Sequence, residues 1–308
     1  MTSRSFNAHG KLLLFGEYVV LDGCRALAWP VKFGQSLQVN SEQAHTKGLY
    51  WKSIDHKGEV WFEAWFDEDL NLLHGLDDEV ARRLQGFLMH ARALNPLFLK
   101  DGLYHEAHIS TDHPGEWGLG SSSTLISLIA QWAGADAMDL FFRSFSGSGY
   151  DIACATAGKP ILYQLMAPQK ANWEELDLNP AFLHGAIFVY LGKKQDSREG
   201  IAHYQAQGFD KEVLIQNMDG MVTELLHHPE RNSLLLAMKE SEELLSKSLN
   251  LEKVKDLHFS DFPGEIKSLG AWGGDFVMAL AEDPGFDQTT YFRKKGCEVI
   301  FTAKDLLI

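Results

Sequence analysis

The stretch Pro114-Gly115-Glu116-Trp117-Gly118-Leu119-Gly120-Ser121-Ser122-Ser123-Thr124 decides how we interpret this chain. It lies between a strand-like segment, residues 104–112, and an apolar helical segment, residues 124–133, so its glycines and serines form the turn that opens a helix. Glycines let the backbone approach a ligand closely, and the first N–H groups of a helix lack internal partners and favour an anion. The stretch therefore predicts a phosphate-binding loop.

A purely structural turn is the alternative, because glycine and serine are common in turns and serine is a frequent helix N-cap. The loop alone leaves both interpretations open. The rest of the chain has to decide between them.

The composition is that of a globular protein with no overall attraction to polyanions. The 308 residues are 45% hydrophobic and 23% charged, and the formal net charge is −14. This balance argues against nucleic acid or an anionic membrane as a partner, so any anion site must be local. The length suffices for one large or two ordinary domains.

Cysteine and histidine usage indicates neither a disulfide framework nor a metal centre. The three cysteines, Cys24, Cys154 and Cys297, are far apart, and the thirteen histidines are scattered. Residues 1–10 lack the pattern of a signal peptide, and no apolar run reaches the 18 residues of a membrane span. We therefore expect a cytoplasmic protein.

The first segment of interest is Lys11-Leu12-Leu13-Leu14-Phe15-Gly16-Glu17-Tyr18-Val19-Val20-Leu21, an apolar run that predicts a buried strand or two short strands. Gly16 and Glu17 interrupt it. A glutamate among apolar residues must reach water or find a partner, so Glu17 either turns outward or is paired. Lys11 is equally open, because a lysine at a strand edge is usually solvated.

Two later segments carry candidate chemistry. Ser146-Gly147-Ser148-Gly149-Tyr150-Asp151 leads into a run of small residues, and such a turn can hold one carboxylate as a general base, or make Asp151 a simple helix N-cap. After a strand at residues 186–191, Lys193, Lys194 and Arg198 place three cations within six residues. They could meet an anionic substrate or form a solvated loop.

The remaining periodicity is mostly structural. Helical spacing is seen at residues 77–94, 214–225, 234–245 and 288–295, and strand-like sequence at residues 26–39, 49–66, 276–281 and 298–302. A glycine-rich turn, Lys267-Ser268-Leu269-Gly270-Ala271-Trp272-Gly273-Gly274-Asp275, feeds the strand at residues 276–281. The composition changes at residues 166–180, which predicts a linker or a surface excursion. We place a domain boundary there.

Taken together, the motifs resemble the GHMP kinase superfamily, which includes galactokinase, homoserine kinase, mevalonate kinase and phosphomevalonate kinase. Residues 10–18 are similar to the first motif of that family, residues 114–124 to the phosphate-loop pattern P-x-x-x-G-L-G-S-S, and residues 267–275 to the third motif. The chain contains no G-x-x-x-x-G-K-[ST] sequence, so a P-loop nucleotide site is excluded.

The resemblance implies an α+β, two-domain GHMP kinase fold. Residues 1–170 would form an N-terminal, ribosomal-protein-S5-domain-2-like ATP-binding domain, and residues 171–308 a C-terminal ferredoxin-like domain, with the active site in the cleft between them. It further implies an ATP- and Mg²⁺-dependent kinase of isoprenoid precursor synthesis, acting on mevalonate or 5-phosphomevalonate. The expected partner is an anionic small molecule, and a homodimer is among the assemblies that the sequence leaves open.

The resemblance also assigns residues to roles. Lys11 and Asp151 would be catalytic, and Ser122 would be a Mg²⁺ ligand. The residues expected to bind the nucleotide are Gly118, Leu119, Gly120, Ser121, Ser122 and Ser123. Those expected to face the substrate are Glu17, Tyr18, Ser197 and Arg198.

Some positions depart from the family pattern. Tyr18 follows Glu17 as in phosphomevalonate kinases, whereas mevalonate kinases usually carry His there, and Trp272 replaces a glycine of the third motif. No residue is assigned as the second Mg²⁺ ligand. The alternatives are another member of the superfamily, such as a homoserine or sugar kinase or diphosphomevalonate decarboxylase, and a non-catalytic binding module with the same fold.

Overall fold

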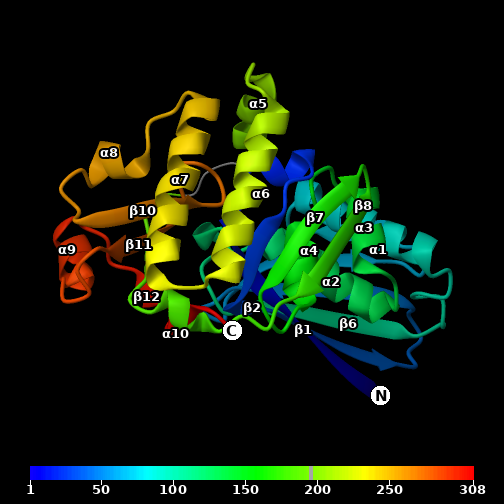
Figure 1. The fold of residues 1–308 in the computed structure, drawn as a ribbon. Helices are drawn as coiled ribbons and strands as arrows, with labels where there is room; N and C mark the ends of the chain where they lie inside the picture. Colours follow the sequence, from blue (N-terminus) through cyan, green and yellow to red (C-terminus); the bar gives the residue numbers. More distant parts are fainter. Residues whose placement is uncertain (194–196) are drawn as a thin grey trace. The chain divides into compact units, whose positions relative to one another are not determined.

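The computed structural model describes residues 1–193 and 197–308 (Figure 1). The chain forms two compact units. Unit 1 consists of Met1–Gly10, Phe33–Gly115 and Leu119–Thr156, and unit 2 of Lys11–Lys32, Glu116–Gly118 and Ala157–Ile308. Each unit is built from several stretches of sequence. None of the helices in the described part of the chain combines the length and the apolar character that crossing a lipid bilayer requires.

Unit 1 is organised around a sheet of strands in the order β5-β4-β3-β6-β2, with β1 also paired to β2. The strands are β1 (Thr2–Phe15), β2 (Ala26–Glu42), β3 (Gly48–Ile54), β4 (Val60–Phe66), β5 (Leu72–Gly75) and β6 (Tyr104–Thr111). The end of β1 from Lys11 and the start of β2 as far as Lys32 belong to unit 2. Strands β3 and β6 run parallel, and the other registered neighbours in this order run antiparallel. Burial alternates along β3, where Leu49 and Trp51 are buried and Tyr50 and Lys52 are not, as expected for a sheet covered on one face.

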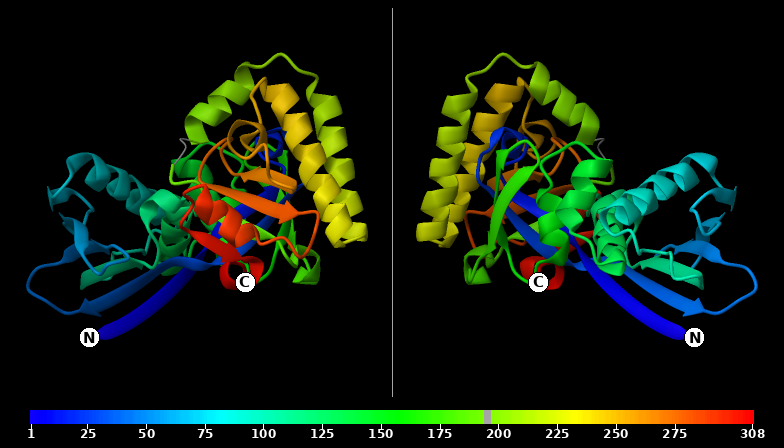
Figure 2. Two further views of the ribbon diagram at one scale, coloured as in Figure 1. Left: turned by 90° about the vertical axis from the view of Figure 1, so that its left-hand side faces the viewer. Right: turned by 90° about the vertical axis from the view of Figure 1, so that its right-hand side faces the viewer.

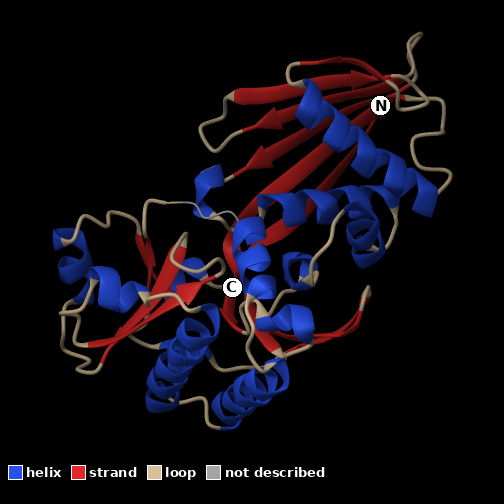
Figure 3. Cartoon of the chain, turned by 90° about the horizontal axis from the view of Figure 1, so that it is seen from above, coloured by secondary structure: helices blue, strands red, loops and turns tan. Residues whose placement is uncertain are grey.

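Helices cover that face of the sheet (Figure 3). They are α1 (Asp78–Leu94), α2 (Ser121–Ala133), α3 (Ala137–Ser144) and α4 (Tyr150–Thr156). Ala81, Leu84, Leu88 and Ala91 follow helical spacing in α1 and enter the same core as the inward residues of the sheet. The Asp77 side chain accepts the N–H groups of Glu79 and Val80, which starts α1 where the sequence predicts it.

Unit 2 contains a second sheet, in the order β10-β11-β9-β12, and a hairpin of β7 (Ile161–Ala167) and β8 (Lys170–Glu175). Strand β7 continues the first sheet by pairing antiparallel with residues 26–28 of β2. The strands of the second sheet are β9 (Ile187–Tyr190), β10 (Gly264–Leu269), β11 (Phe276–Ala281) and β12 (Ile300–Thr302). Its α-helices are α5 (Ser197–Ala206), α6 (Lys211–His227), α7 (Arg231–Leu249), α8 (Val254–His258), α9 (Gln288–Lys294) and α10 (Ala303–Leu306). The long helices α6 and α7 lie side by side, and α7 packs on β10 (Figures 1 and 2).

Some expectations need correction. The strand predicted from Lys11 begins at Thr2 and ends at Phe15, and Val19–Asp22 is a short 3-10 helix (η1) rather than a second strand. The chain turns at Gly16, whose φ of 100° favours glycine. Residues 166–180 are not a bare linker, because they contain β8. The predicted boundary between residues 170 and 171 falls at the start of β8 and stays a prediction.

Candidate functional site

The predicted phosphate loop connects β6 to the N-terminus of α2. Gly118 and Gly120 adopt φ values of 68° and 93°, a region that suits glycine, and Gly120 is the N-cap of α2. The carbonyl of Gly120 accepts the N–H groups of Ser123 and Thr124, both at 3.0 Å. The N–H groups of Ser121 and Ser122 have no acceptor within the first turn, as at any helix start. The loop therefore offers the donors that a phosphate requires.

The three serines of the loop begin the helix rather than precede it. Ser122 is exposed, whereas Ser123 is buried and its hydroxyl donates a hydrogen bond to the carboxylate of Asp151. The adjacent Thr124 is anchored by donating to Gln35 Oε1 at 2.6 Å. Ser122 is the most exposed of the three serines, Ser121 is half-buried, and Ser123 holds Asp151. The role of Ser122 as a metal ligand stays a prediction.

Asp151 lies in the first turn of α4, half-buried. The carbonyl of Gly149 accepts the N–H groups of Ile152 and Ala153 at 3.0 and 3.3 Å, so the first helical hydrogen bonds end on Gly149 rather than Asp151. The Asp151 side chain also accepts the N–H group of Ile152 at 3.1 Å. Its second oxygen faces Ser123. Asp151 is therefore more than a helix cap, because it joins the starts of α2 and α4 within unit 1.

Lys11 contacts the phosphate loop from β1. Its Nζ donates to the carbonyl of Gly118 at 3.3 Å, a contact within unit 2. This ammonium group therefore lies against Gly118, the second glycine of the loop. Lys11 and Asp151 belong to different units, and their expected proximity stays a prediction.

Glu17 is paired rather than turned outward. Its side chain accepts a hydrogen bond from Lys267 Nζ, and the two residues are only 2% and 0% exposed. Lys267 Nζ also donates to the carbonyl of Ser268 at 3.0 Å, and Ser268 N–H donates to Glu242 Oε1 at 2.9 Å. We call Glu17, Glu242 and Lys267 the buried triad.

The buried triad holds two carboxylates and only one lysine. Burial raises the pKa of Glu17, an effect that Lys267 partly offsets, and burial raises the pKa of Glu242 to about 8. An unbalanced buried charge is expensive, so one carboxylate of the triad is best protonated at neutral pH. Glu17 accepts directly from Lys267 Nζ, whereas Glu242 accepts the N–H group of Ser268, so we assign the proton to Glu242.

Tyr18 fastens the first motif to the third. Its hydroxyl accepts the N–H group of Trp272 at 2.7 Å, and its ring stacks on Tyr204 with centroids 5.7 Å apart. Trp272, the residue that departs from the family pattern, donates its indole N–H to the carbonyl of Glu252 at 3.0 Å. The bulky ring is therefore accommodated by a hydrogen bond of its own.

Asp275 is a functional candidate that the sequence interpretation left without a role. It ends the third motif, and a β-carbon at residue 118 would collide with its carboxylate, so Asp275 lies directly against Gly118 of the phosphate loop. Both residues belong to unit 2. Its place as the one carboxylate in a glycine-rich motif was the available signal.

The cationic segment is only partly described. Lys193, Ser197 and Arg198 are exposed, the latter two at the start of α5, while Lys194 lies outside the described residues. The carbonyl of Lys193 accepts the N–H group of Asp275 at 2.9 Å. Lys193 is therefore attached to the end of the third motif, within unit 2.

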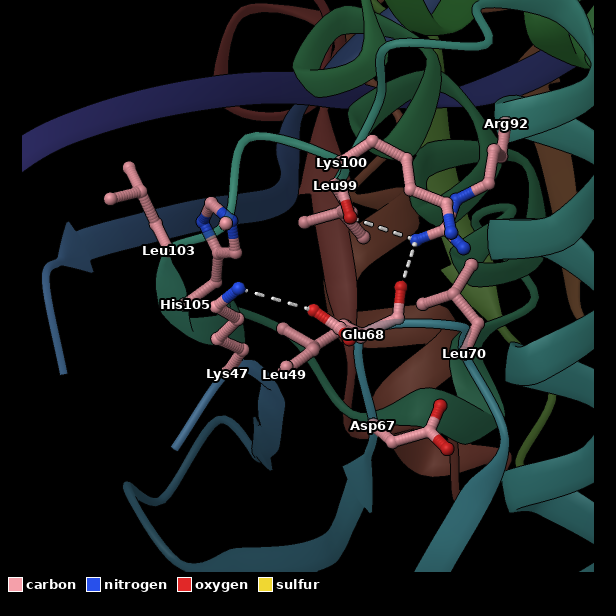
Figure 4. Close-up of a pocket in the computed structure, with 12 residues that line it drawn as sticks. Lys47, Leu49, Asp67, Glu68, Leu70, Arg92, Leu99, Lys100, Leu103 and His105 are labelled. Atoms are coloured by element: carbon pink, nitrogen blue, oxygen red, sulfur yellow. Dashed lines mark hydrogen bonds and ion pairs between the residues drawn. The ribbon is translucent and has the colours of Figure 1, made fainter. Parts of the chain in front are cut away.

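Unit 1 also has a pocket whose cations are already engaged (Figure 4). Arg92 donates to the carbonyls of Glu68, Phe98 and Leu99 at 3.0 to 3.1 Å, and Lys47 lies 3.6 Å from the carboxylate of Glu68. Arg92 thus fastens two loops together. Because Arg92 and Lys47 already have partners within the protein, we assign no ligand to this pocket.

Solved structures of several kinases share this architecture. The mevalonate kinase of Methanococcus jannaschii matches with a TM-score of 0.70 at 17% identity, over 97% of each chain. The phosphomevalonate kinase of Streptococcus pneumoniae, in complex with phosphomevalonate and AMPPNP, matches with a TM-score of 0.66 at 17% identity, over 98% of this chain and 99% of that one. The chain has the fold of these kinases.

The kinase fold extends to a sugar kinase as well. The galactokinase of Lactococcus lactis, complexed with galactose, matches with a TM-score of 0.64 at 14% identity, over 95% of this chain and 88% of that one. No protein-family model and no curated protein matches the sequence. The similarity thus confirms the predicted α+β, two-domain kinase fold, which the three motifs indicated.

Proposed function

We propose that this protein is an ATP- and Mg²⁺-dependent kinase that transfers the γ-phosphoryl group of ATP to mevalonate or 5-phosphomevalonate. The observation that carries the proposal is the contact between Ser123 and Asp151. It attaches a carboxylate that can accept a hydroxyl proton to the first turn of the helix whose N-terminus suits phosphate. The kinase fold and the contact of Lys11 with Gly118 support it.

On the nucleotide side, the N–H groups from Gly118 to Ser123 would bind phosphate oxygens, and Lys11 would stabilise negative charge that develops during transfer. A hydroxyl oxygen is a ligand that Mg²⁺ accepts, and the exposed Ser122 is the residue of this turn that would supply one. When bound, ATP and Mg²⁺ supply the phosphoryl group and neutralise its charge.

On the acceptor side, Asp151 would orient the attacking hydroxyl group and take its proton. Lys193, Ser197 and Arg198 would meet the anionic end of the acceptor. Glu17 and Tyr18 enter the proposal differently, because both are buried and both hold the third motif. We propose that they act on the substrate through that motif.

Incubating the protein with ATP, Mg²⁺ and, in turn, mevalonate, 5-phosphomevalonate, homoserine or galactose tests the proposal. We expect ADP release with one of the first two acceptors. Release with homoserine or galactose would move the assignment within the superfamily, and carbon dioxide release from diphosphomevalonate would indicate a decarboxylase. No acceptor-dependent ADP release, together with tight AMPPNP binding, would favour the non-catalytic module.

A further inference from the structure

The carboxylate of Asp275 lies against Gly118 of the phosphate loop, a place where a negative charge would oppose phosphate. Gly118 has a φ of 68°, and any side chain there would collide with Asp275. Glycine at position 118 therefore serves two purposes, the turn of the loop and the close approach of this carboxylate. The close approach therefore depends on glycine at position 118 and on aspartate at position 275.

The backbone holds Asp275 in place. Its φ is 47°, a left-handed conformation that few residues other than glycine adopt, although Asp and Asn tolerate it. Its N–H group donates to the carbonyl of Lys193, and its carbonyl accepts the N–H group of Leu191, both at 2.9 Å. A strained residue held by its surroundings is typical of functional sites. These hydrogen bonds fix the backbone that carries the carboxylate.

A fixed carboxylate opposes the binding of phosphate. Lys11, which contacts the carbonyl of the same Gly118, supplies one positive charge, whereas the phosphates of a nucleotide carry several negative ones. A divalent cation resolves the conflict, because carboxylate and phosphate oxygens are both ligands that Mg²⁺ prefers. An acidic residue beside a phosphate site is then favourable only when metal accompanies the nucleotide.

We propose that Asp275 belongs to the nucleotide site and makes nucleotide binding depend on a divalent cation. The carboxylate attracts the metal that is bound to the phosphates and repels the metal-free nucleotide. This inference rests on the proposed function. It concerns the part of that function left unassigned by the sequence, the second ligand of the metal.

Titrating AMPPNP into the wild-type protein and into Asp275→Asn, in the presence of Mg²⁺ and in EDTA, tests the inference. Asparagine keeps the size of the side chain and tolerates the left-handed backbone. We expect Asp275→Asn to bind the Mg²⁺ complex about tenfold more weakly, a typical coupling between two bound groups, and metal-free AMPPNP no more weakly than wild type. Binding of Mn²⁺ to the AMPPNP complex, measured by electron paramagnetic resonance, should weaken in parallel.

Glu240→Gln, which removes a negative charge from the exposed face of α7, is the matched control and should leave both titrations unchanged. Equal weakening of metal-bound and metal-free AMPPNP by Asp275→Asn would overturn the inference and would make Asp275 a support for Lys11 or the loop. Unchanged affinities for both forms of AMPPNP in Asp275→Asn would overturn it as well. Failure of the wild-type protein to bind AMPPNP in either condition would overturn the proposed function together with this inference.

Discussion

Asp151 and Glu17 are both carboxylates close behind a glycine in a motif, yet their surroundings are opposite. Asp151 is half-buried at the start of a helix and is held by the hydroxyl of Ser123. Glu17 is 2% exposed and is held by Lys267, which is itself fully buried. A carboxylate within reach of solvent can exchange a proton with a ligand, whereas one paired in the interior mainly holds structure. A motif alone does not distinguish the two.

The first prediction tests the catalytic half of this comparison. Asp151→Asn should lower turnover by about 10² to 10⁴, because the amide cannot take a proton. It should leave the affinity for AMPPNP and the unfolding midpoint nearly unchanged. Steady-state kinetics with the accepted substrate, nucleotide titration and thermal unfolding measure the three quantities. Ser123→Ala keeps the carboxylate and should lose less turnover, and full turnover in Asp151→Asn would remove Asp151 from the mechanism.

The second prediction tests the structural half. Lys267→Met leaves Glu17 buried without its partner and should lower the free energy of unfolding by about 3–5 kcal/mol, measured by urea titration. Adding Glu17→Leu should restore much of the loss, because an apolar pair of similar size avoids the buried charge. Lys239→Met, at an exposed position of α7, is the control. Wild-type stability in Lys267→Met would show that the pair contributes nothing.

The third prediction concerns the pH dependence of stability. The pKa of Glu242 is about 8 in the folded protein against 4.5 for the free side chain, so the folded state binds more protons between these values. The contribution of Glu242 to stability is therefore fully present below pH 4.5 and is lost as the pH rises to about 8, at up to about 1.4 kcal/mol per pH unit. Urea unfolding across this range measures it.

Glu242→Gln removes the titrating group and should flatten that part of the profile. The difference between the two proteins isolates Glu242 from the histidines, which titrate in the same range. A wild-type stability that rises from pH 5 to 8 by more than that of Glu242→Gln would contradict the assignment of the proton.

The fourth prediction, with the smallest expected effect, tests whether Tyr18 supports the third motif or contacts the substrate directly. Tyr18→Phe keeps the ring but removes the acceptor for the N–H group of Trp272, and should lower the free energy of unfolding by about 1 kcal/mol. If Tyr18 acts through the third motif, the KM for nucleotide and for acceptor should change together. A large increase in the acceptor KM alone, at unchanged stability, would show direct contact with the substrate.

Much of the fold was readable from periodicity. The helices at residues 77–94, 214–225 and 234–245 were predicted because their apolar residues recur at helical spacing, and the loop before α2 because glycine and serine mark a turn. The strand at Lys11 was predicted too short, because Thr2–Gly10 is mostly polar and its pairing with β2 leaves no pattern in the sequence. Strand β8 was missed for the same reason, as an exposed hairpin strand without alternation.

The candidate site divides in the same way. The sequence by itself determined the order of the motifs and the glycine-rich turn before the helix, because these depend on residue type and local pattern. The roles of Lys11, Ser122 and Asp151 followed from the resemblance of those motifs and stay predictions. The tertiary structure decided that Ser123 contacts Asp151, that Lys267 is the partner of Glu17, and that Asp275 lies on Gly118. These pairs are 28, 250 and 157 residues apart in the chain, respectively. Only folding brings such residues together, and no local pattern records which carboxylate will meet which partner.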